Sequence, residues 1–498
     1  MAPWARSLLA AAPVAVVFAL IGSRRVAAWI AAVAGALMAL ALAVTVWELP
    51  WPAALTAAGY GIATGIFPIL YVIFGSLLLY HLTAVTGWAG QLRDSLVNVA
   101  RDRHLLLLIV GFGFAAFLDS TAGFLTPVTV ATVLLTGLGV PPFEAAAYTL
   151  VAASMPPVFG GMGIPVLVAA DVARVPLEPF ARVQAAVAAV VFAGFPTYLT
   201  LAFGGRGALR RLWPESLAAG LAYSAALWWT VTRVSLYPAA MAGSLAALLA
   251  IGAVQLLRSR GRRPGGLVLW RAAAPWWPYW VLMGAVTVWS VPVVSRVLGR
   301  FTFAVPLAGL PGLTWRAEIV ASPGTAILAA SMGVALGSRA TRPQIRQALR
   351  LTTTQVRYPM VTMLSMLALA QVMSASGMTR SVGQSLAGAG AAFPFLGPLL
   401  SWLGAAIAGS NTASNALLGR LQAVTASQLG LDPITALSFA GAGAALGKMA
   451  SPQVVAAAAA AGGIAGSEGR LLRVGIRHGL LWAAVVGAAA MLVARVPR

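Results

Sequence analysis

The sequence predicts an all-α polytopic membrane protein, with about 12 or more transmembrane helices in two inverted repeats that each contain a broken or re-entrant helix region. Of its 498 residues, 60% are hydrophobic and 9% are charged, and the mean hydropathy is +0.88, whereas soluble domains carry about 25% charged residues. Continuous apolar runs approach the roughly 20 residues that span a bilayer, without the alternation of outer-membrane barrels. Gly, Pro, Ser and Thr interrupt two regions, 118–170 and 407–464.

The expected helices lie where apolar runs alternate with short polar loops. The first run is followed at once by Arg24 and Arg25 and then by a second run, so we expect a retained helix rather than a cleaved signal peptide. Trp and Tyr gather near the ends of several runs, as they do at membrane interfaces. Outside the two broken regions, the runs are 8–21, 26–46, 66–85, 105–118, 180–203, 217–234, 236–257, 275–298, 319–336, 360–375 and 480–493.

The charge pattern predicts the orientation of the chain. The net charge is +22, and the basic residues lie between apolar runs, where the positive-inside rule expects them in a membrane protein. This distribution favours a lipid bilayer over nucleic acid as the partner. We expect a first repeat over 1–257, a basic cytoplasmic linker over 258–272 and a second repeat over 273–498. The chain contains no cysteine, which excludes disulfides and thiolate chemistry.

The two broken regions resemble each other in sequence. Asp119 precedes Gly139 by 20 residues and Ser410 precedes Gly430 by 20 residues. LGVPPFEA at 138–145, which contains Gly139, matches LGLDPITA at 429–436, which contains Gly430. The arginine-bearing loops predict that the two regions enter the membrane from opposite sides. Inverted repeats with broken helices near the midplane are a recurring plan of secondary transporters, because unwound backbone and half-helix N-termini can bind ions and carboxylates there.

Several motifs strongly resemble the bacterial lactate permease family, over about 66–478. They are LDSTAGFLTPV, LGVPPFEA, FGGMGIPV, GSNTASNALLGRLQAVTASQLGL, GKMASPQ and GSEGRLLR. The resemblance implies proton-coupled symport of L-lactate, glycolate and related 2-hydroxy monocarboxylates across the bacterial cytoplasmic (inner) membrane, without enzymatic activity or a cofactor. The sequence departs from the family at four positions. Asp119 and Leu125 stand where the family usually has Glu and Gly. Ala413 replaces a usual Ser, and near His81 the family more often has an amide.

Asp119 is the candidate for proton coupling. It follows an apolar run and opens the Ser-Thr-Ala-Gly break, and an ionisable side chain inside a membrane is costly and usually functional. A carboxyl that titrates near neutrality can take a proton from one side and release it on the other. The alternatives are a cap on the half-helix that begins near Ala122, or a cation ligand.

Lys448 is the only lysine among 33 basic residues, and it lies in an apolar stretch. A compact ammonium can bind a small carboxylate or lose its proton when buried, which an arginine cannot do. We therefore expect Lys448 to bind substrate or to pair with Asp119. The alternative is a lysine that extends its ammonium to the membrane interface.

The other binding candidates are polar residues and a glycine at the breaks, which can donate to a carboxylate and exchange hydrogen bonds with a 2-hydroxyl. Helix capping requires the same residue types, and the two roles are compatible. The candidates are Ser410, Asn411, Thr412, Ser414 and Asn415 in the second repeat, Ser120, Thr121 and Gly123 in the first, and Gln453 after the Ser451–Pro452 break.

His81 lies inside an apolar run and is a second candidate for proton coupling, because histidine titrates near neutrality; packing within the helix is the alternative. The three histidines are scattered and suggest no metal site. No Walker A, GxSxG or HExxH motif is present, so no motif of these kinds indicates ATP-driven transport or hydrolysis. A sodium-coupled carrier of another organic anion remains open, and a channel or an intramembrane enzyme is the alternative from a different class.

Overall fold

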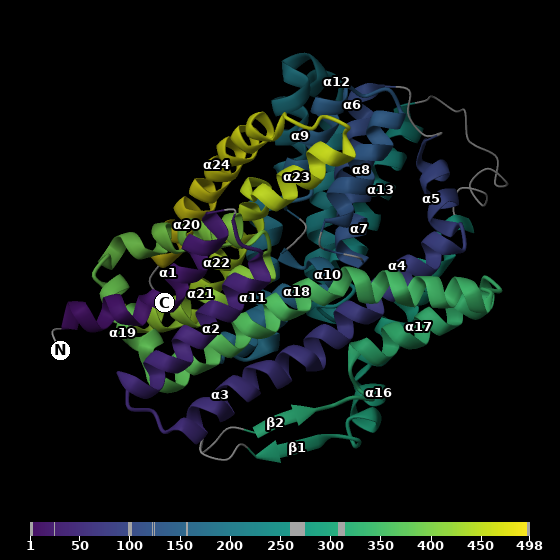
Figure 1. Cartoon of the computed structure of the whole chain (residues 1–498). Coiled ribbons are helices and arrows are strands. Elements are labelled where there is room, and N and C mark those ends of the chain that lie inside the picture. Colours follow the sequence, from purple (N-terminus) through teal and green to yellow (C-terminus); the bar gives the residue numbers. More distant parts are fainter. Residues whose placement is uncertain are drawn as a thin grey trace.

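The computed structural model describes residues 3–23, 25–97, 102–121, 123, 125–155, 158–258, 274–306 and 314–495. These residues are almost entirely helical, and Figure 1 shows the helices packed into one body, with a small hairpin at the lower edge. Within these ranges, nine helical segments are long and apolar enough to cross a membrane, and four shorter apolar helices accompany them. The prediction of a helical polytopic membrane protein is confirmed.

The first half of the chain runs from α1 to α13. The join Gly65–Leu70 between α3 and α4 is kinked at Phe67, whose backbone is extended, and the join Leu107–Phe114 between α6 and α7 is π-helical. The helices are α1 (Pro3–Gly22), α2 (Ala28–Thr45), α3 (Trp51–Thr64), α4 (Tyr71–Val85), α5 (Trp88–Val97), α6 (Arg103–Leu106), α7 (Ala115–Thr121), α8 (Thr126–Gly137), α9 (Pro142–Ala152), α10 (Gly160–Ala173), α11 (Leu177–Phe192), α12 (Phe195–Arg233) and α13 (Ala239–Arg258).

The second half contains a β-hairpin and the remaining helices. Short 3₁₀ turns at Ala274–Trp276, Gly390–Ala392 and Lys448–Ala450 each lie directly before or between helices. The elements are α15 (Trp277–Ser290), α16 (Pro292–Leu298), β1 (Phe303–Pro306), β2 (Thr314–Ala317), α17 (Pro323–Gly337), α18 (Arg342–Ser376), α19 (Met378–Ala387), α20 (Phe393–Ala408), α21 (Asn411–Gln428), α22 (Pro433–Gly447), α23 (Pro452–Ala461) and α24 (Glu468–Ala494).

The broken regions of the two halves pack on each other reciprocally. Helix α8 of the first region contacts α23 of the second, and α21 of the second contacts α10 of the first. In the same way α9 contacts α24, and α22 contacts α11. Each contact has a counterpart with the halves exchanged, which is the packing expected of two repeats related by a pseudo-two-fold axis. A second group of helices (α2, α3, α4, α17 and α18) packs beside this core, and Figure 1 shows the long α18 crossing the molecule next to α3.

The helices break where backbone conformation or a cap stops them. Helix α20 ends at Gly409, whose φ of +73° is left-handed, and Ser410 then caps α21 by accepting a hydrogen bond from the Ala413 backbone N–H. In the first region, the start of α10 contains three consecutive left-handed residues, at 161–163. A left-handed run cannot continue a right-handed helix, so both regions present helix ends inside the protein.

The structure differs from the expected helices at four places. Helix α3 was not expected, because its Ala- and Gly-rich sequence gives a weak apolar run; Gly61 lets it approach α18 so closely that an added Cβ would lie 2.5 Å from the Leu367 carbonyl oxygen. Helix α18 begins at Arg342, well before the expected 360, with a capping box of Thr341 and Gln344. Helix α12 is kinked at Gly205, whose φ of +66° is non-helical, and the expected run 180–203 is divided between α11 and the part of α12 before this kink.

The fourth difference is the antiparallel hairpin, in which Phe303 pairs with Ala317 and Pro306 with Thr314. The all-helical prediction did not include this hairpin, because strands this short carry little periodic signal in the sequence. The expected linker over 258–272 lies, apart from its first residue, outside the described residues, so the predicted division into two sequence repeats stays a prediction.

Candidate functional site

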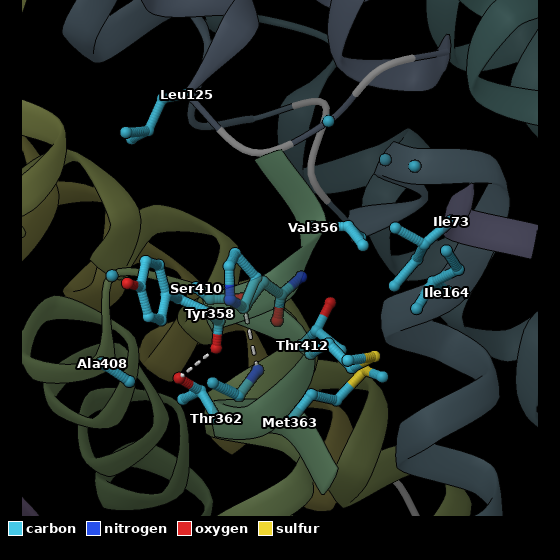
Figure 2. Close-up of a pocket in the computed structure, with 18 of the residues that line it drawn as sticks. Ile73, Leu125, Ile164, Val356, Tyr358, Thr362, Met363, Ala408, Ser410 and Thr412 are labelled. Atoms are coloured by element: carbon cyan, nitrogen blue, oxygen red, sulfur yellow. Dashed lines mark hydrogen bonds between the residues drawn. The ribbon is translucent and has the colours of Figure 1, made fainter. Parts of the chain in front are cut away.

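A cavity of about 670 Å³ lies where the broken helices meet α2 and α18, and we call it the central cavity. Side chains and backbone from both breaks reach it: Thr121 and Gly123 from the first, Ser410 and Thr412 from the second. Figure 2 shows Ser410 and Thr412 beside the labelled α18 residues, with Ile73 and Ile164 on the opposite side. The cavity therefore combines polar helix ends with an apolar wall, which is the usual composition of a small-molecule site.

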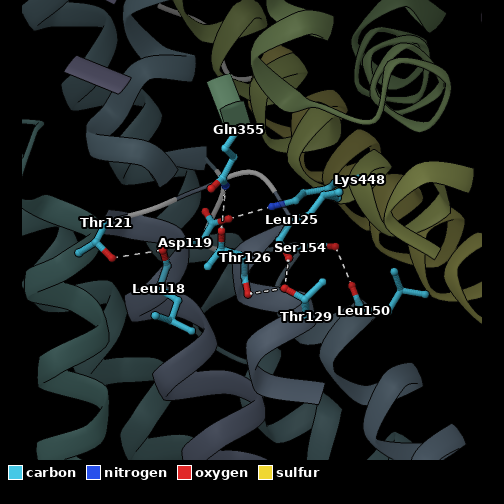
Figure 3. Close-up of polar contacts among 10 residues, drawn as sticks. All are labelled: Leu118, Asp119, Thr121, Leu125, Thr126, Thr129, Leu150, Ser154, Gln355 and Lys448. Carbon is cyan, nitrogen blue, oxygen red and sulfur yellow. Dashed lines mark hydrogen bonds and ion pairs between the residues drawn. The ribbon is translucent and has the colours of Figure 1, made fainter. Parts of the chain in front are cut away.

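A buried ion pair lies at one side of the central cavity. The Lys448 ammonium donates to Oδ1 of Asp119 over 2.8 Å, and the two side chains are 6% and 2% exposed. Figure 3 shows Lys448 reaching across to Asp119 from the other repeat region. Both residues also line the cavity. The pair joins the two candidate charged residues, which are 329 positions apart in the sequence.

Gly160 makes room for the Asp119 carboxylate. A Cβ added to Gly160 would lie 2.0 Å from Oδ2 of Asp119, far inside a contact distance. The carboxylate thus sits against bare backbone at the start of α10. Any side chain at position 160 would have to displace the carboxylate from this place.

The second break supplies the other polar wall of the cavity. At Gly409, an added Cβ would lie 2.9 Å from Oγ of Ser451 and 3.0 Å from Oε1 of Gln453. The starts of α21 and α23 are therefore adjacent, and their N-terminal backbone N–H groups carry partial positive charge. The Ser451 hydroxyl is fully buried and has no hydrogen-bond partner within the described part of the chain. This constellation suits a small anion that also carries a hydroxyl group.

Most of the predicted site residues lie on the central cavity. Those that line it are Asp119, Thr121, Gly123, Ser410, Asn411, Thr412, Lys448 and Gln453. Their convergence follows from the reciprocal packing of the two broken regions.

Four predicted residues lie behind this lining and make other contacts. Ser120 donates to the Phe117 carbonyl and Ser414 to the Ser401 carbonyl, while Asn415 Nδ2 donates to the Pro165 carbonyl of the broken helix α10. His81 Nε2 lies 2.8 Å from Oε1 of Gln355. These contacts give each residue a structural role, and their part in transport stays a prediction.

Sequence reasoning missed the contribution of α2 and α18. Gln355 lines the cavity and connects His81 to Thr126, and Trp29, stacked on Tyr358 with ring centroids 6.1 Å apart, forms part of the wall. The basic N-terminal half of α18 obscured the signal, because four arginines suggested a solvated loop. A polar Gln355 one turn before Pro359, just ahead of an apolar run, is the feature that could have revealed it.

The described residues contain no group of three or more His, Asp or Glu side chains that could hold a metal ion. The chemistry available at the cavity is therefore that of one ion pair, hydroxyl and amide groups, and helix N-termini. Groups of these kinds can bind an anion and can exchange protons.

Comparisons with known proteins identify the family to which the sequence is similar. A family model described as L-lactate permease matches residues 6–497. The chain is 29% identical to the L-lactate permease of Bacillus subtilis, over 95% of this chain and 93% of that one, and 29% identical to a glycolate permease of Escherichia coli, over 98% and 96%. A transporter structure from Alcanivorax borkumensis aligns with 87% of this chain and 86% of that one, at a TM-score of 0.45 and 16% identity.

Proposed function

The chain belongs to the L-lactate permease family, and from this membership we propose that it is a secondary active transporter for L-lactate, glycolate and related 2-hydroxy monocarboxylates, coupled to protons, in the bacterial cytoplasmic membrane. Its relatives are permeases, and it is a multi-pass membrane protein rather than an enzyme. In the structure, the observation that supports the proposal most directly is the Asp119–Lys448 pair on the wall of the central cavity.

In this proposal the substrate carboxylate binds near the Lys448 ammonium and the start of α21. Hydrogen bonds to a charged group contribute about 1.5–3 kcal/mol each, and a helix N-terminus adds a favourable partial charge. Ser410, Thr412 and Gln453 lie on the same cavity and can exchange hydrogen bonds with the 2-hydroxyl. The apolar wall, which includes Ile73 and Ile164, accommodates the remaining carbon atoms.

The ion pair also provides a route to proton coupling. Asp119 and the substrate carboxylate compete for one ammonium, because within the described chain Lys448 is the only cation paired with Asp119. When Lys448 turns to the substrate, the Asp119 carboxylate loses its counter-charge while it remains buried. A buried, unpaired carboxylate is costly and is neutralised by taking up a proton. One anion and one proton then cross together. When the anion is released, Lys448 returns to Asp119, whose carboxyl gives up its proton to the same side, and the ion pair is restored.

The test is uptake of labelled L-lactate by proteoliposomes that contain the purified full-length protein. A proton gradient, acid outside, and an inward sodium gradient are imposed in separate experiments. We expect accumulation above equilibrium with the proton gradient alone, and its collapse when a protonophore is added. Accumulation driven by sodium alone would favour the alternative, a sodium-coupled carrier of an organic anion, and equilibration with no accumulation under either gradient would contradict active transport.

A further inference from the structure

A second polar feature lies at the surface, where α24 begins beside α9. It is a groove of about 290 Å³, which we call the basic groove. Its lining comes from the start of α9 and the first half of α24. The residues are Phe143, Arg470, Arg473, Val474, Arg477 and His478.

The three arginines form one stripe along α24. Arg470, Arg473 and Arg477 are spaced by three and four residues, so they lie on the same face of the helix, and all three are exposed. No ion pair holds any of them within the part of the chain that the structure describes. Glu468, two residues before Arg470, falls on the opposite side of the helix because two residues rotate by about 200°. The groove therefore has an uncompensated positive charge.

Aromatic rings fix the walls of the basic groove. The Arg470 guanidinium lies 4.4 Å above the centroid of the Phe143 ring. The His478 ring stacks on Phe203 with centroids 5.6 Å apart and hydrogen-bonds to the Tyr198 hydroxyl. Contacts with aromatic rings thus orient two of the six lining side chains, Arg470 and His478, without a ligand.

The arginine stripe continues along α24 as an apolar stripe. Leu481 and Val485 follow Arg477 by four and eight residues, and they are 50% and 44% exposed. Along one helix face the surface changes from cationic to apolar over one turn. A phospholipid has the same lengthwise pattern, with a charged headgroup followed by an acyl chain.

The surroundings place this groove at a membrane surface. Arg103 forms an ion pair with Glu144, the neighbour of Phe143, and Arg211 lies 3.6 Å from the Asp102 carboxylate. These contacts connect the groove to further arginines near α6 and α12. By the positive-inside rule, such a concentration of arginine marks the cytoplasmic face, where the leaflet carries anionic lipids.

We propose that the basic groove binds the headgroup phosphate of an anionic phospholipid of the cytoplasmic leaflet, with an acyl chain lying along Leu481 and Val485. Arginine suits this partner because its planar guanidinium binds phosphate oxygens bidentately. Lipid at this position bridges α24, which follows the second broken region, to α9 within the first. The site is separate from the central cavity and requires no transported substrate.

The experiment titrates the detergent-solubilised full-length protein with phosphatidylglycerol, with phosphatidylcholine of the same acyl chains, and with inorganic phosphate. Native mass spectrometry counts bound lipid, and the Tm reports stabilisation. We expect phosphatidylglycerol to bind and raise the Tm, and the other two to do so far less. In the variant Arg470→Gln/Arg473→Gln/Arg477→Gln, the affinity for phosphatidylglycerol falls on the order of a hundredfold, since each arginine contributes about 1 kcal/mol at such a surface.

The matched control removes three arginines from another exposed helical stripe, as Arg342→Gln/Arg346→Gln/Arg350→Gln on α18. It retains wild-type affinity if the groove, rather than net charge, binds the lipid. If the triple groove variant does not fold, the single change Arg473→Gln gives a loss of about fivefold. The proposal is overturned if the groove variant binds phosphatidylglycerol as the wild type does, if both triple variants lose affinity equally, or if phosphatidylcholine or phosphate stabilises as well as phosphatidylglycerol.

Discussion

Asp119 and Lys448 satisfy each other's charge, so a change to either residue acts on both. The pair is almost fully buried, and removing one partner leaves the other charged group without compensation in a poorly hydrated site. The substrate anion is the natural replacement for the missing negative charge beside Lys448. An anion can replace the charge of Asp119 but not that of Lys448, so variants of the two residues should behave differently.

The variant Asp119→Asn removes the negative charge and mimics the protonated carboxyl in size. We expect it to lose uphill, proton-driven lactate accumulation, because the position can no longer exchange a proton. Lactate counterflow between the two sides survives, because exchange requires no net proton movement and Lys448 still binds the anion. Uptake and counterflow in the same proteoliposomes measure both effects. Wild-type accumulation in Asp119→Asn would show that the proton is carried elsewhere.

The variant Lys448→Arg keeps the positive charge but changes its shape. Arginine has a larger planar group and does not lose its proton. The Lys448 ammonium hydrogen-bonds to Oδ1 of Asp119 at a buried position, where the larger guanidinium would have to displace its neighbours. We expect a reduction of lactate uptake by at least about tenfold, while Lys448→Ala abolishes binding. Equilibrium binding of labelled lactate separates the two variants. Normal transport by Lys448→Arg would mean that the use of lysine here has no functional reason.

At the scale of elements, helix α21 serves both the site and the packing, and two asparagines on its first turns separate these roles. Asn411 lines the central cavity. Asn415, one turn later, donates to the Pro165 carbonyl and so holds the broken start of α10 against α21. Neighbouring positions on one helix therefore act on different properties.

We expect Asn411→Ala to weaken lactate binding by about tenfold or more with little change in Tm, since it removes hydrogen bonds to a desolvated anion. Asn415→Ala instead removes the hydrogen bond that joins α21 to the Pro165 carbonyl of α10, which destabilises the fold by about 0.5–1.5 kcal/mol. Binding isotherms and thermal unfolding of both purified variants check the distinction. Unchanged affinity in a well-folded Asn411→Ala would remove this residue from the site, and an unchanged Tm in Asn415→Ala would contradict its structural role.

Continuous apolar runs predicted most of the long helices, and their interruption by Gly, Pro, Ser and Thr predicted the two breaks, because both are local properties of the sequence. It identified Asp119 and Lys448 as unusual but left their pairing open, since a contact between residues so far apart depends on how the repeats pack. Gln355 was missed because its environment is set by α4 and α8 rather than by its own arginine-rich helix. The short hairpin was missed because each of its strands has only four residues, which is too few for a recognisable alternating pattern.

At the scale of the whole molecule, the reciprocal contacts of α8 with α23 and of α21 with α10 place the central cavity between two similar structures. Two repeats that enter from opposite sides have equivalent packings, so a molecule built from them can expose the same site to either side of the membrane. A carrier does so in alternation, and its substrate shifts the balance between the two states. A channel leaves the site open in a fixed manner.

The absence of cysteine makes this alternation measurable, because a single introduced thiol is the only one in the chain. Leu125 lines the cavity and is 38% exposed, so Leu125→Cys reports access to the site, and Glu178→Cys, at an 84% exposed side chain on α11, is the control. With a membrane-impermeant maleimide applied from one side of oriented vesicles, we expect saturating lactate to change the labelling rate at position 125 severalfold and leave position 178 unchanged. In the proposed transport cycle Asp119 takes up a proton, so Asp119→Asn combined with Leu125→Cys should shift the rate without lactate. A labelling rate at position 125 that is independent of both lactate and Asp119 would indicate a fixed pore and contradict alternating access.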